Sequence, residues 1–300
     1  MFDVCIVGSG PAGMTAALYT ARAGRTAVVL EEKTVGGQMA ETSVIENMPG
    51  SPNAEGWELA MKLSQQVTDL EVETVYEKAT AIESLGDHVA VTTETGQVIE
   101  AGRLILAPGV KRRQLGVPGE DRLRGRGVGY CAVCDGAFFK GKVVAVSGGG
   151  NTALEDALYL AGLCEKVYLV VRKNYCRGQE SLQKRVREKE NIEILYESRI
   201  TRILGEDKVS GVMVEGPEGE KEIALSGVFV AIGLSPDPAL FRDVVELTPE
   251  GYIETDEDMR TSDPLIFAAG DIRRKEIRQI VTALSDGAIA AEMAGRSLSE

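Results

Sequence analysis

The residues best suited to chemistry lie in the stretch YCAVCDGAFF, residues 130–139. It places two thiols three positions apart, Cys131 and Cys134, with the carboxyl group of Asp135 directly behind them. A close thiol pair can bind zinc, can be a structural feature, or can open and close as a redox-active dithiol. Which of these applies depends on the elements that surround the pair.

Zinc would normally need four ligands, and the chain offers few. Its one histidine is His88, and Cys164 and Cys176 are isolated from each other and from the pair. We therefore predict no metal site and a redox role for the pair. Thiol–disulfide exchange requires a thiolate, which CxxC spacing favours, and an acid to protonate the departing sulfur. Asp135 is the acid closest to the pair in the sequence, and its alternative role is to cap a helix N-terminus.

The composition limits the possible classes of function. The 300 residues are enough for about two domains, and the net charge of −13 disfavours nucleic acid and anionic membranes as partners. We find no apolar run of the roughly 18 residues that a membrane span needs. The first residues, MFDVCIVGSG, carry no basic region, so we expect a cytoplasmic protein, in which stable disulfides are unusual.

The N-terminal segment predicts a dinucleotide-binding unit. An apolar strand over residues 2–7 leads into GSGPAG, residues 8–13, and then into an Ala-rich helix. Gly8 permits a tight turn, Gly10 lets the backbone approach a pyrophosphate, and Gly13 lets helix and strand pack closely. The helix N-terminus favours the anion. Glu31 follows a second strand and can accept a hydrogen bond from a ribose hydroxyl, which favours FAD.

The same plan recurs in the second half of the chain. A strand over residues 142–147 leads into GGGNTA, residues 148–153, and a helix and a second strand over 166–171 follow. Here the second strand is followed by Arg172, Lys173 and Arg177 instead of an acid. A cationic cluster suits a nucleotide that carries a 2′-phosphate, and a solvated basic loop is the alternative. We therefore predict NADPH at this turn, with NADH possible.

Each predicted unit is followed by a pair of alternating strands, around residues 95–96 and 216–219, and then by another apolar strand. The fold class is therefore α/β, with two Rossmann-like three-layer domains, each with a small antiparallel ribbon. Gly/Pro-rich crossings at GVPGE and GLSPDP predict a two-strand hinge. The predicted domains are an FAD-binding domain, residues 1–115 and 239–300, and an NAD(P)H-binding domain with the CxxC, residues 116–238.

With these motifs in place, the chain resembles the low-molecular-weight thioredoxin reductases over essentially its whole length. The resemblance rests on GSGPAG, GGQ at 36–38, ENMPG at 46–50, CAVCDG, GGGNTALEDALYL, AIGLSPD, AAGD and RQIVTA. It implies a homodimer that passes electrons from NADPH through FAD and the dithiol to thioredoxin. It also implies that Cys134 faces the flavin, that Cys131 attacks the protein disulfide, and that Asp135 is the acid.

The predicted cofactor-binding residues follow from the glycine turns and from the resemblance. For FAD they are Gly8, Ser9, Gly10, Pro11, Ala12, Gly13, Glu31, Glu32, Gly36, Gly37, Gln38, Asn47, Ala107, Gly109, Gly270, Asp271, Arg278, Gln279 and Ile280. For the nicotinamide nucleotide they are Gly148, Gly150, Asn151, Thr152, Ala153, Arg172, Lys173 and Arg177.

The chain departs from the family pattern at three positions. Members that use NADPH typically read HRRxxxR after the second strand, whereas this chain has Val171 for the histidine and Lys173 for an arginine. Lysine provides a point charge without the planar fork of arginine. Pro108 replaces the usual threonine. Val171 and Lys173 leave NADH open as the donor. Surface loops set the choice of acceptor, so the same electron path could serve a peroxiredoxin, a glutaredoxin-like protein or a small dithiol. Ferredoxin is a further possible donor, which the intact turn at residues 148–153 and the basic cluster disfavour.

Overall fold

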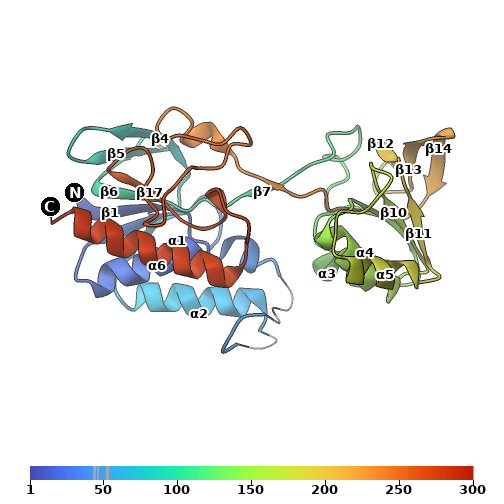
Figure 1. Ribbon diagram of the computed structural model, residues 1–300, viewed down its shortest axis with the longest axis horizontal. Helices are drawn as coiled ribbons and strands as arrows, with labels where there is room; N and C mark the ends of the chain where they lie inside the picture. Colours follow the sequence, from blue (N-terminus) through green and yellow to red (C-terminus); the bar gives the residue numbers. More distant parts are fainter. Residues whose placement is uncertain (43–44, 46, 52–53, 300) are drawn as a thin grey trace. The chain divides into compact units, whose positions relative to one another are not determined.

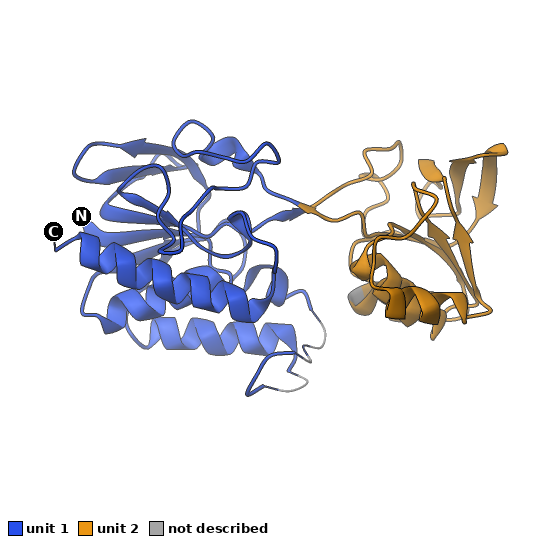
Figure 2. Cartoon of the chain, in the orientation of Figure 1, with its two compact units in different colours: residues 1–111, 235–300 blue, residues 112–234 orange. Residues whose placement is uncertain are grey.

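The computed structural model describes residues 1–42, 45, 47–51 and 54–299 (Figure 1). The side chain of Cys134 lies outside the described part. The chain divides into two compact units, one of Met1–Lys111 with Ser235–Glu300 and one of Arg112–Leu234 (Figure 2). These boundaries fall a few residues before the domain boundaries expected from the sequence. The assignment of FAD to one domain and NAD(P)H to the other stays a prediction.

The described strands of the first unit form a seven-stranded sheet in the order β3-β2-β1-β6-β5-β4, with β17 paired to β6. The strands β1, β2, β3, β6 and β17 are parallel, and β4 and β5 form the antiparallel ribbon. Their bounds are β1 Phe2–Val7, β2 Ala27–Leu30, β3 Glu73–Val75, β4 Ala79–Ser84, β5 Val89–Thr93, β6 Val98–Leu106 and β17 Ile266–Ala268.

Alternate side chains of β1 enter different cores, which gives the first unit its three layers. Val4 and Ile6 pack in a core with the helices, whereas Cys5 and Val7 pack with the ribbon and the segment near Phe241. The period of two along a strand produces this division. The long helices α1 Pro11–Arg22, α2 Gly56–Thr68 and α6 Ile280–Ser297 lie together on one side of the sheet (Figure 1). The short helices are η1 Gly37–Met39, η4 Gly270–Ile272 and η3 Pro238–Leu240, and η3 lies beside β4 of the ribbon.

The second unit repeats this layering with a five-stranded parallel sheet, among its described residues, in the order β11-β10-β9-β15-β8. Val144 and Val146 pack with the helices, and Ala145 packs with an antiparallel ribbon. The sheet strands are β8 Val128–Gly129, β9 Val143–Ser147, β10 Lys166–Val170, β11 Ile192–Leu195 and β15 Gly227–Val230. The ribbon is β12 Arg199–Leu204, β13 Gly211–Gly216 and β14 Gly219–Ala224, and the helices are α3 Ala132–Asp135, η2 Gly136–Phe139, α4 Asn151–Ala161 and α5 Glu180–Arg187.

The two crossing segments pair with each other as a small sheet of β7, Lys111–Arg112, and β16, Leu234–Ser235. The amide of Arg113 also donates to the carbonyl oxygen of Gly233 at 2.9 Å. The second crossing thus falls within the predicted GLSPDP, whereas the first falls at residues 111–112, ahead of the predicted GVPGE, which belongs to the second unit. In the described part of the chain, we find no helix with the length and apolar character needed to cross a membrane.

The contact between α1 and α6 depends on a glycine. A Cβ atom on Gly287 would overlap the carbonyl oxygen of Ala12, so the two helices approach closely only because Gly287 has none. Gly295 follows Gly287 by eight residues on α6. A Cβ atom on Gly295 would meet only the flexible side chain of Arg25, with Nε at 3.0 Å.

We therefore expect Gly287→Ala to destabilise the protein by about 1–3 kcal/mol through overpacking. The matched control, Gly295→Ala, should be neutral or stabilising by up to about 1 kcal/mol, because alanine favours helix more than glycine does. Urea unfolding followed by circular dichroism measures both. Equal loss of stability in the two variants would contradict the packing argument.

Candidate active site

The first glycine turn has the geometry of a pyrophosphate-binding loop. Gly8 has φ +100°, and a Cβ atom there would overlap the carbonyl oxygen of Ala107. A Cβ atom on Gly13 would overlap the carbonyl oxygen of Gly8. At Gly10, by contrast, no described atom lies within 4 Å of the Cβ position, so this side of the turn is open to a ligand. None of the described side chains caps the N-terminus of α1, whose amides remain available to an anion.

Glu31 is held against this turn by hydrogen bonds. The backbone amide and the hydroxyl of Ser9 donate to Glu31 Oε2 at 2.9 and 2.6 Å, and the amide of Lys33 donates to Oε1 at 2.9 Å. A carboxylate has about four acceptor positions, so Glu31 retains capacity for a ribose hydroxyl. The neighbouring Glu32 is exposed and lies 4.0 Å from Lys78, in an ion pair apart from the turn.

A second segment, residues 36–38, lies beside the turn. The amide of Gly36 donates to the carbonyl oxygen of Ser9 at 2.9 Å, and Gly37 lies near Gly10. The side chain of Gln38 donates to the carbonyl oxygen of Val110 at 2.8 Å. Asn47 is joined to α6, because its side-chain amide donates to Gln279 Oε1 at 2.8 Å. The fold thus brings together residues that the sequence separates widely.

The segment at Asp271 also reaches the start of α1. Gly270 has φ +81°, and a Cβ atom there would lie 2.9 Å from Cβ of Ala12. Asp271 Oδ1 is buried and accepts no hydrogen bond from the described residues. The nearest cation is Lys275 Nζ at 3.7 Å, which is too long for a hydrogen bond. Burial raises the pKa of Asp271, against the opposing charge of Lys275. A buried acceptor without a donor is costly, so a ligand hydroxyl fits here.

Sequence reasoning missed the ionic cluster that supports this segment. Asp286, on the buried side of α6, accepts from the amide of Gly270 at 3.0 Å, from Arg273 Nη1 at 2.9 Å and from Lys275 Nζ at 2.9 Å. The signal available in the sequence was a lone acid at helical spacing from Ala283, Gly287 and Ala290. A carboxylate on an apolar helix face needs partners that only the fold supplies.

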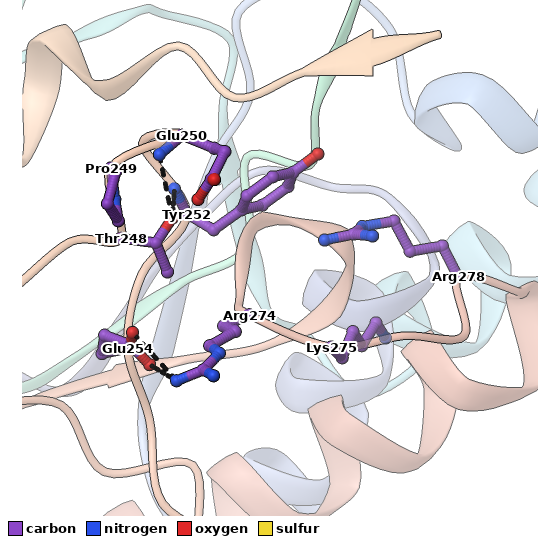
Figure 3. Close-up of a pocket in the computed structure, with 8 residues that line it drawn as sticks. All are labelled: Thr248, Pro249, Glu250, Tyr252, Glu254, Arg274, Lys275 and Arg278. Carbon is purple, nitrogen blue, oxygen red and sulfur yellow. Dashed lines mark hydrogen bonds and ion pairs between the residues drawn. The ribbon is translucent and has the colours of Figure 1, made fainter.

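Next to this cluster lies a pocket of about 380 Å³ (Figure 3). The guanidinium of Arg278 stacks on the ring of Tyr252 at 4.2 Å, and Arg274 pairs with Glu254 at 3.2 Å. Arg278 Nε also donates to the carbonyl oxygen of Asp271 at 3.3 Å. The pocket is lined by Thr248, Pro249, Glu250, Tyr252, Glu254, Arg274, Lys275 and Arg278.

The second glycine turn repeats the geometry of the first. Gly148 has φ +148°, and a Cβ atom there would overlap the carbonyl oxygen of Ala231. No described atom approaches within 4 Å of the Cβ position of Gly150, which precedes α4. The loop 177–179 lies along this turn: the amide of Arg177 donates to the carbonyl oxygen of Gly149 at 2.6 Å, and Asn151 Oδ1 accepts from the amide of Gln179 at 2.7 Å.

The three predicted cations near this turn have different surroundings. Arg172, Lys173 and Arg177 are all exposed. Lys173 Nζ donates to the hydroxyl of Tyr175 at 2.9 Å and lies 5.0 Å from its ring centre, an arrangement that the sequence analysis missed. Arg172 forms no hydrogen bond or ion pair with the residues that the structure describes, and it lines a pocket of about 310 Å³ together with Ser198 and Pro217. Arg172 is therefore more available to a phosphate than Lys173 is.

Cys131 is disulfide-bonded, whereas Cys5, Cys164 and Cys176 are free and buried. The predicted partner, Cys134, belongs to α3, but its side chain lies outside the described residues. The amide of Asp135 donates to the carbonyl oxygen of Cys131 at 3.1 Å, which is the helical hydrogen bond of the single turn α3. Within the described residues, no cluster of His, Cys, Asp or Glu side chains is arranged to hold a metal ion.

The carboxyl group of Asp135 is suited to carrying a proton. Burial raises its pKa, and the charge of Arg112 opposes the shift. The N-cap alternative fails among the described residues, because the Asp135 side chain makes no capping hydrogen bond to η2. Asp156 on α4, which the sequence analysis did not single out, also lies in the electrostatic field of Arg112. Burial raises the pKa of Asp156 to about 7.

Comparison with known proteins gives one consistent family. A model of the pyridine nucleotide-disulphide oxidoreductases matches residues 2–287. The thioredoxin reductase of Listeria monocytogenes is 41% identical over 100% of this chain and 95% of its own length, and that of Bacillus subtilis is 42% identical over 97% and 93%. The crystal structure of Lactococcus lactis thioredoxin reductase, 41% identical, covers 100% of this chain and 99% of its own, with a TM-score of 0.91.

These matches confirm the resemblance drawn from the motifs and the predicted fold class of two Rossmann-like domains with antiparallel ribbons. The family model covers residues 2–287 and the Lactococcus lactis structure covers the whole chain, so the matched region contains both glycine turns and the CxxC segment. The chain belongs to the pyridine nucleotide-disulphide oxidoreductase family.

Proposed function

We propose that this enzyme is a thioredoxin-disulfide reductase that takes electrons from NADPH, with FAD as its bound cofactor. The observation that carries the proposal is the disulfide at Cys131 beside the half-buried carboxyl of Asp135, in the unit that also contains the second glycine turn. Relatives that are 41–42% identical over nearly the whole chain bear the name thioredoxin reductase. This identity over nearly the whole length supports the same activity here.

The first unit fits FAD. The open side of Gly10 accommodates the pyrophosphate, Glu31 accepts from a ribose hydroxyl, and Asp271 accepts from a hydroxyl of the flavin side chain. The N-terminus of α6 would direct its positive end at the flavin ring. The other residues proposed to hold FAD are Ser9, Pro11, Ala12, Gly13, Gly36, Gly37, Gln38, Asn47, Ala107, Gly109, Gly270, Arg278, Gln279 and Ile280, with Glu32 displaced toward Lys78.

The second unit fits a nicotinamide nucleotide, with NADPH favoured over NADH. Arg172 and Arg177 are exposed beside the turn and would bind the 2′-phosphate. Lys173 contributes less than arginine would, because it is already hydrogen-bonded to Tyr175. The turn at Gly148 and Gly150 is intact, with Asn151, Thr152 and Ala153 opening α4, which argues against ferredoxin as the donor.

When bound, FAD accepts a hydride from the nicotinamide and supplies two electrons to a disulfide. Two electrons and two protons convert the Cys131–Cys134 disulfide to a dithiol. The Cys131 thiolate then attacks the thioredoxin disulfide, which breaks and releases one thiolate. Attack by Cys134 on the mixed disulfide frees reduced thioredoxin and restores the enzyme disulfide. Asp135, whose pKa burial raises, can protonate the departing thiolate.

The surface near Cys131 supports a protein as the acceptor. Phe138, on η2, is 74% exposed, and Val133 and Tyr159 are also exposed. The hydroxyl of Tyr159 donates to the carbonyl oxygen of Val133 at 3.4 Å, so the two lie together. Exposed apolar side chains that gather near a reactive group are typical of binding surfaces.

Thioredoxin is the partner that we propose. A peroxiredoxin, a glutaredoxin-like protein or a small dithiol would use the same chemistry. We also propose that the protein is a homodimer and that it is located in the cytoplasm.

The dithiol assignment can be tested by changing Cys134. In Cys134→Ser, NADPH should still reduce the flavin at the wild-type rate, because the hydride step does not use the thiols. Reduction of thioredoxin should stop, since no disulfide can form in the enzyme. Stopped-flow absorbance of the flavin and a coupled thioredoxin assay measure the two steps. Cys176→Ser, which changes a free buried cysteine, is the control. Normal thioredoxin turnover by Cys134→Ser would overturn the mechanism.

Cofactor choice can be tested at Arg172. Loss of one charge-assisted contact of about 1.5–3 kcal/mol should raise KM for NADPH about 10-fold or more in Arg172→Ala. KM for NADH should change little, because NADH has no 2′-phosphate. Arg185→Ala, which removes an exposed cation on α5, controls for general charge effects. Equal effects of Arg172→Ala on the two nucleotides would remove the 2′-phosphate assignment.

The flavin site can be tested at Asp271 without any turnover. In Asp271→Asn, the amide cannot accept as strongly as the carboxyl group, and we expect the Kd for FAD to rise about 10-fold. Titration of the apoprotein with FAD, followed by flavin fluorescence, measures this Kd. The control Asp258→Asn changes an exposed carboxyl group elsewhere in the same unit. Unchanged FAD affinity in Asp271→Asn would exclude this contact.

A further inference from the structure

Glu120 is a buried carboxylate that the proposed reaction does not use. It is 2% exposed and lies in the loop 115–120, directly after the crossing strand β7. Its Oε1 accepts from the amide of Leu115 at 2.9 Å, and its Oε2 accepts from the amide of Gly116 at 2.7 Å. The hydroxyl of Tyr130 also donates to Oε1, at 2.8 Å. Burial of a carboxylate is costly without such donors, so this arrangement requires an explanation.

The loop that carries Glu120 is firmly fixed in the second unit. Gly116 has φ +71° and Gly119 has φ +94°, backbone conformations that suit glycine. The carbonyl oxygen of Pro118 accepts from the amide of Ile203 at 2.9 Å, and this bond ties the loop to β12. A Cβ atom on Gly119 would overlap the carbonyl oxygen of Ile203, so the contact is close. The carboxylate is therefore presented from a rigid support.

The phenol that Glu120 binds belongs to the residue immediately before the redox cysteine. Tyr130 follows the last residue of β8, and Cys131 follows Tyr130. Burial and then the hydrogen bond to Glu120 raise the pKa of Tyr130, so its hydroxyl remains a donor across the physiological range. The guanidinium of Arg124 lies 4.7 Å from the Tyr130 ring centre, and its charge opposes the rise in the Tyr130 pKa.

We propose that Glu120 is a positioning residue for the redox disulfide, and that it acts through its hydrogen bond to Tyr130. The bond fixes the N-terminal end of the segment Cys131–Cys134, and α3 fixes the other end. This inference rests on the proposed function, because it assumes that these two cysteines form the redox pair. Neither Glu120 nor Tyr130 touches a reacting atom in the proposed path.

The expected consequence is a change in the redox potential of the disulfide. In the reduced enzyme, a fixed segment keeps the two thiols close together, which favours closure of the disulfide and lowers its reduction potential. Loss of the hydrogen bond would let the thiols separate, so the disulfide would become easier to reduce. A tenfold loss of effective thiol concentration corresponds to a rise of about 30 mV in the two-electron potential.

The test compares Tyr130→Phe and Glu120→Gln with the wild type as full-length proteins. Each is equilibrated in a series of glutathione redox buffers, quenched in acid and alkylated, and the peptide with residues 131 and 134 is counted as dithiol or disulfide by mass spectrometry. We expect the equilibrium constant for reduction to increase about tenfold in both variants. Tyr130→Phe keeps the ring and its packing, so it remains informative if Glu120→Gln does not fold. Arg124→Gln is the matched control, because it removes the neighbouring cation and its ring contact but leaves both partners of the hydrogen bond between Glu120 and Tyr130 in place.

A potential unchanged in Tyr130→Phe, or an equal shift in Arg124→Gln, would overturn the positioning role. Failure of the proposed function appears differently. In that case the wild-type protein would show no reversible dithiol–disulfide equilibrium at residues 131 and 134, or would not reduce a disulfide acceptor with NADPH. The redox-buffer measurement of the variants itself requires no turnover, so the two failures can be told apart.

Discussion

Both nucleotide sites depend on the close approach of one backbone segment to another at a glycine turn. In the first unit, a Cβ atom on Gly8 would overlap the carbonyl oxygen of Ala107, just beyond β6. In the second unit, a Cβ atom on Gly148 would overlap that of Ala231, just beyond β15. In each sheet the strand before the turn pairs in parallel with the strand that supplies the carbonyl group. Backbone contacts alone position the N-terminus of each helix. The side chains around the two turns can therefore differ and favour different nucleotides.

Carboxylates in this fold serve two purposes, and their surroundings distinguish them. Glu31, Glu120 and Asp286 accept hydrogen bonds from backbone amides of loops, so each fixes a loop beside a site. Asp135 and Asp271 are different, because burial is the largest influence on each and raises its pKa. The carboxyl groups that accept from backbone amides organise loops, whereas the two whose pKa values burial raises suit proton transfer or a ligand hydroxyl.

The sequence predicts the local features well and the long-range side-chain contacts poorly. Strand periodicity and glycine spacing are local, and the strands predicted over residues 2–7 and 142–147 agree with β1 and β9 to within a residue. The roles of Asp286 and Glu120 depend on partners such as Arg273 and Tyr130, which only the folded chain brings near. Lys173 shows that a contact between residues close in sequence can also be missed. Its charge was predicted, but its hydrogen bond to Tyr175, two residues away, was not.

Burial also determines which sulfur atoms can react. Cys5 lies in the core of the first unit, where burial raises the pKa of its thiol to about 12. Burial likewise raises the pKa values of Cys164 and Cys176. At neutral pH these thiols scarcely form the thiolate that attacks a disulfide. The CxxC segment begins instead just beyond a sheet strand, where Cys131 is only partly buried. Thiol exchange is thus confined to one segment by the packing of the fold, although the chain contains five chemically equivalent cysteines.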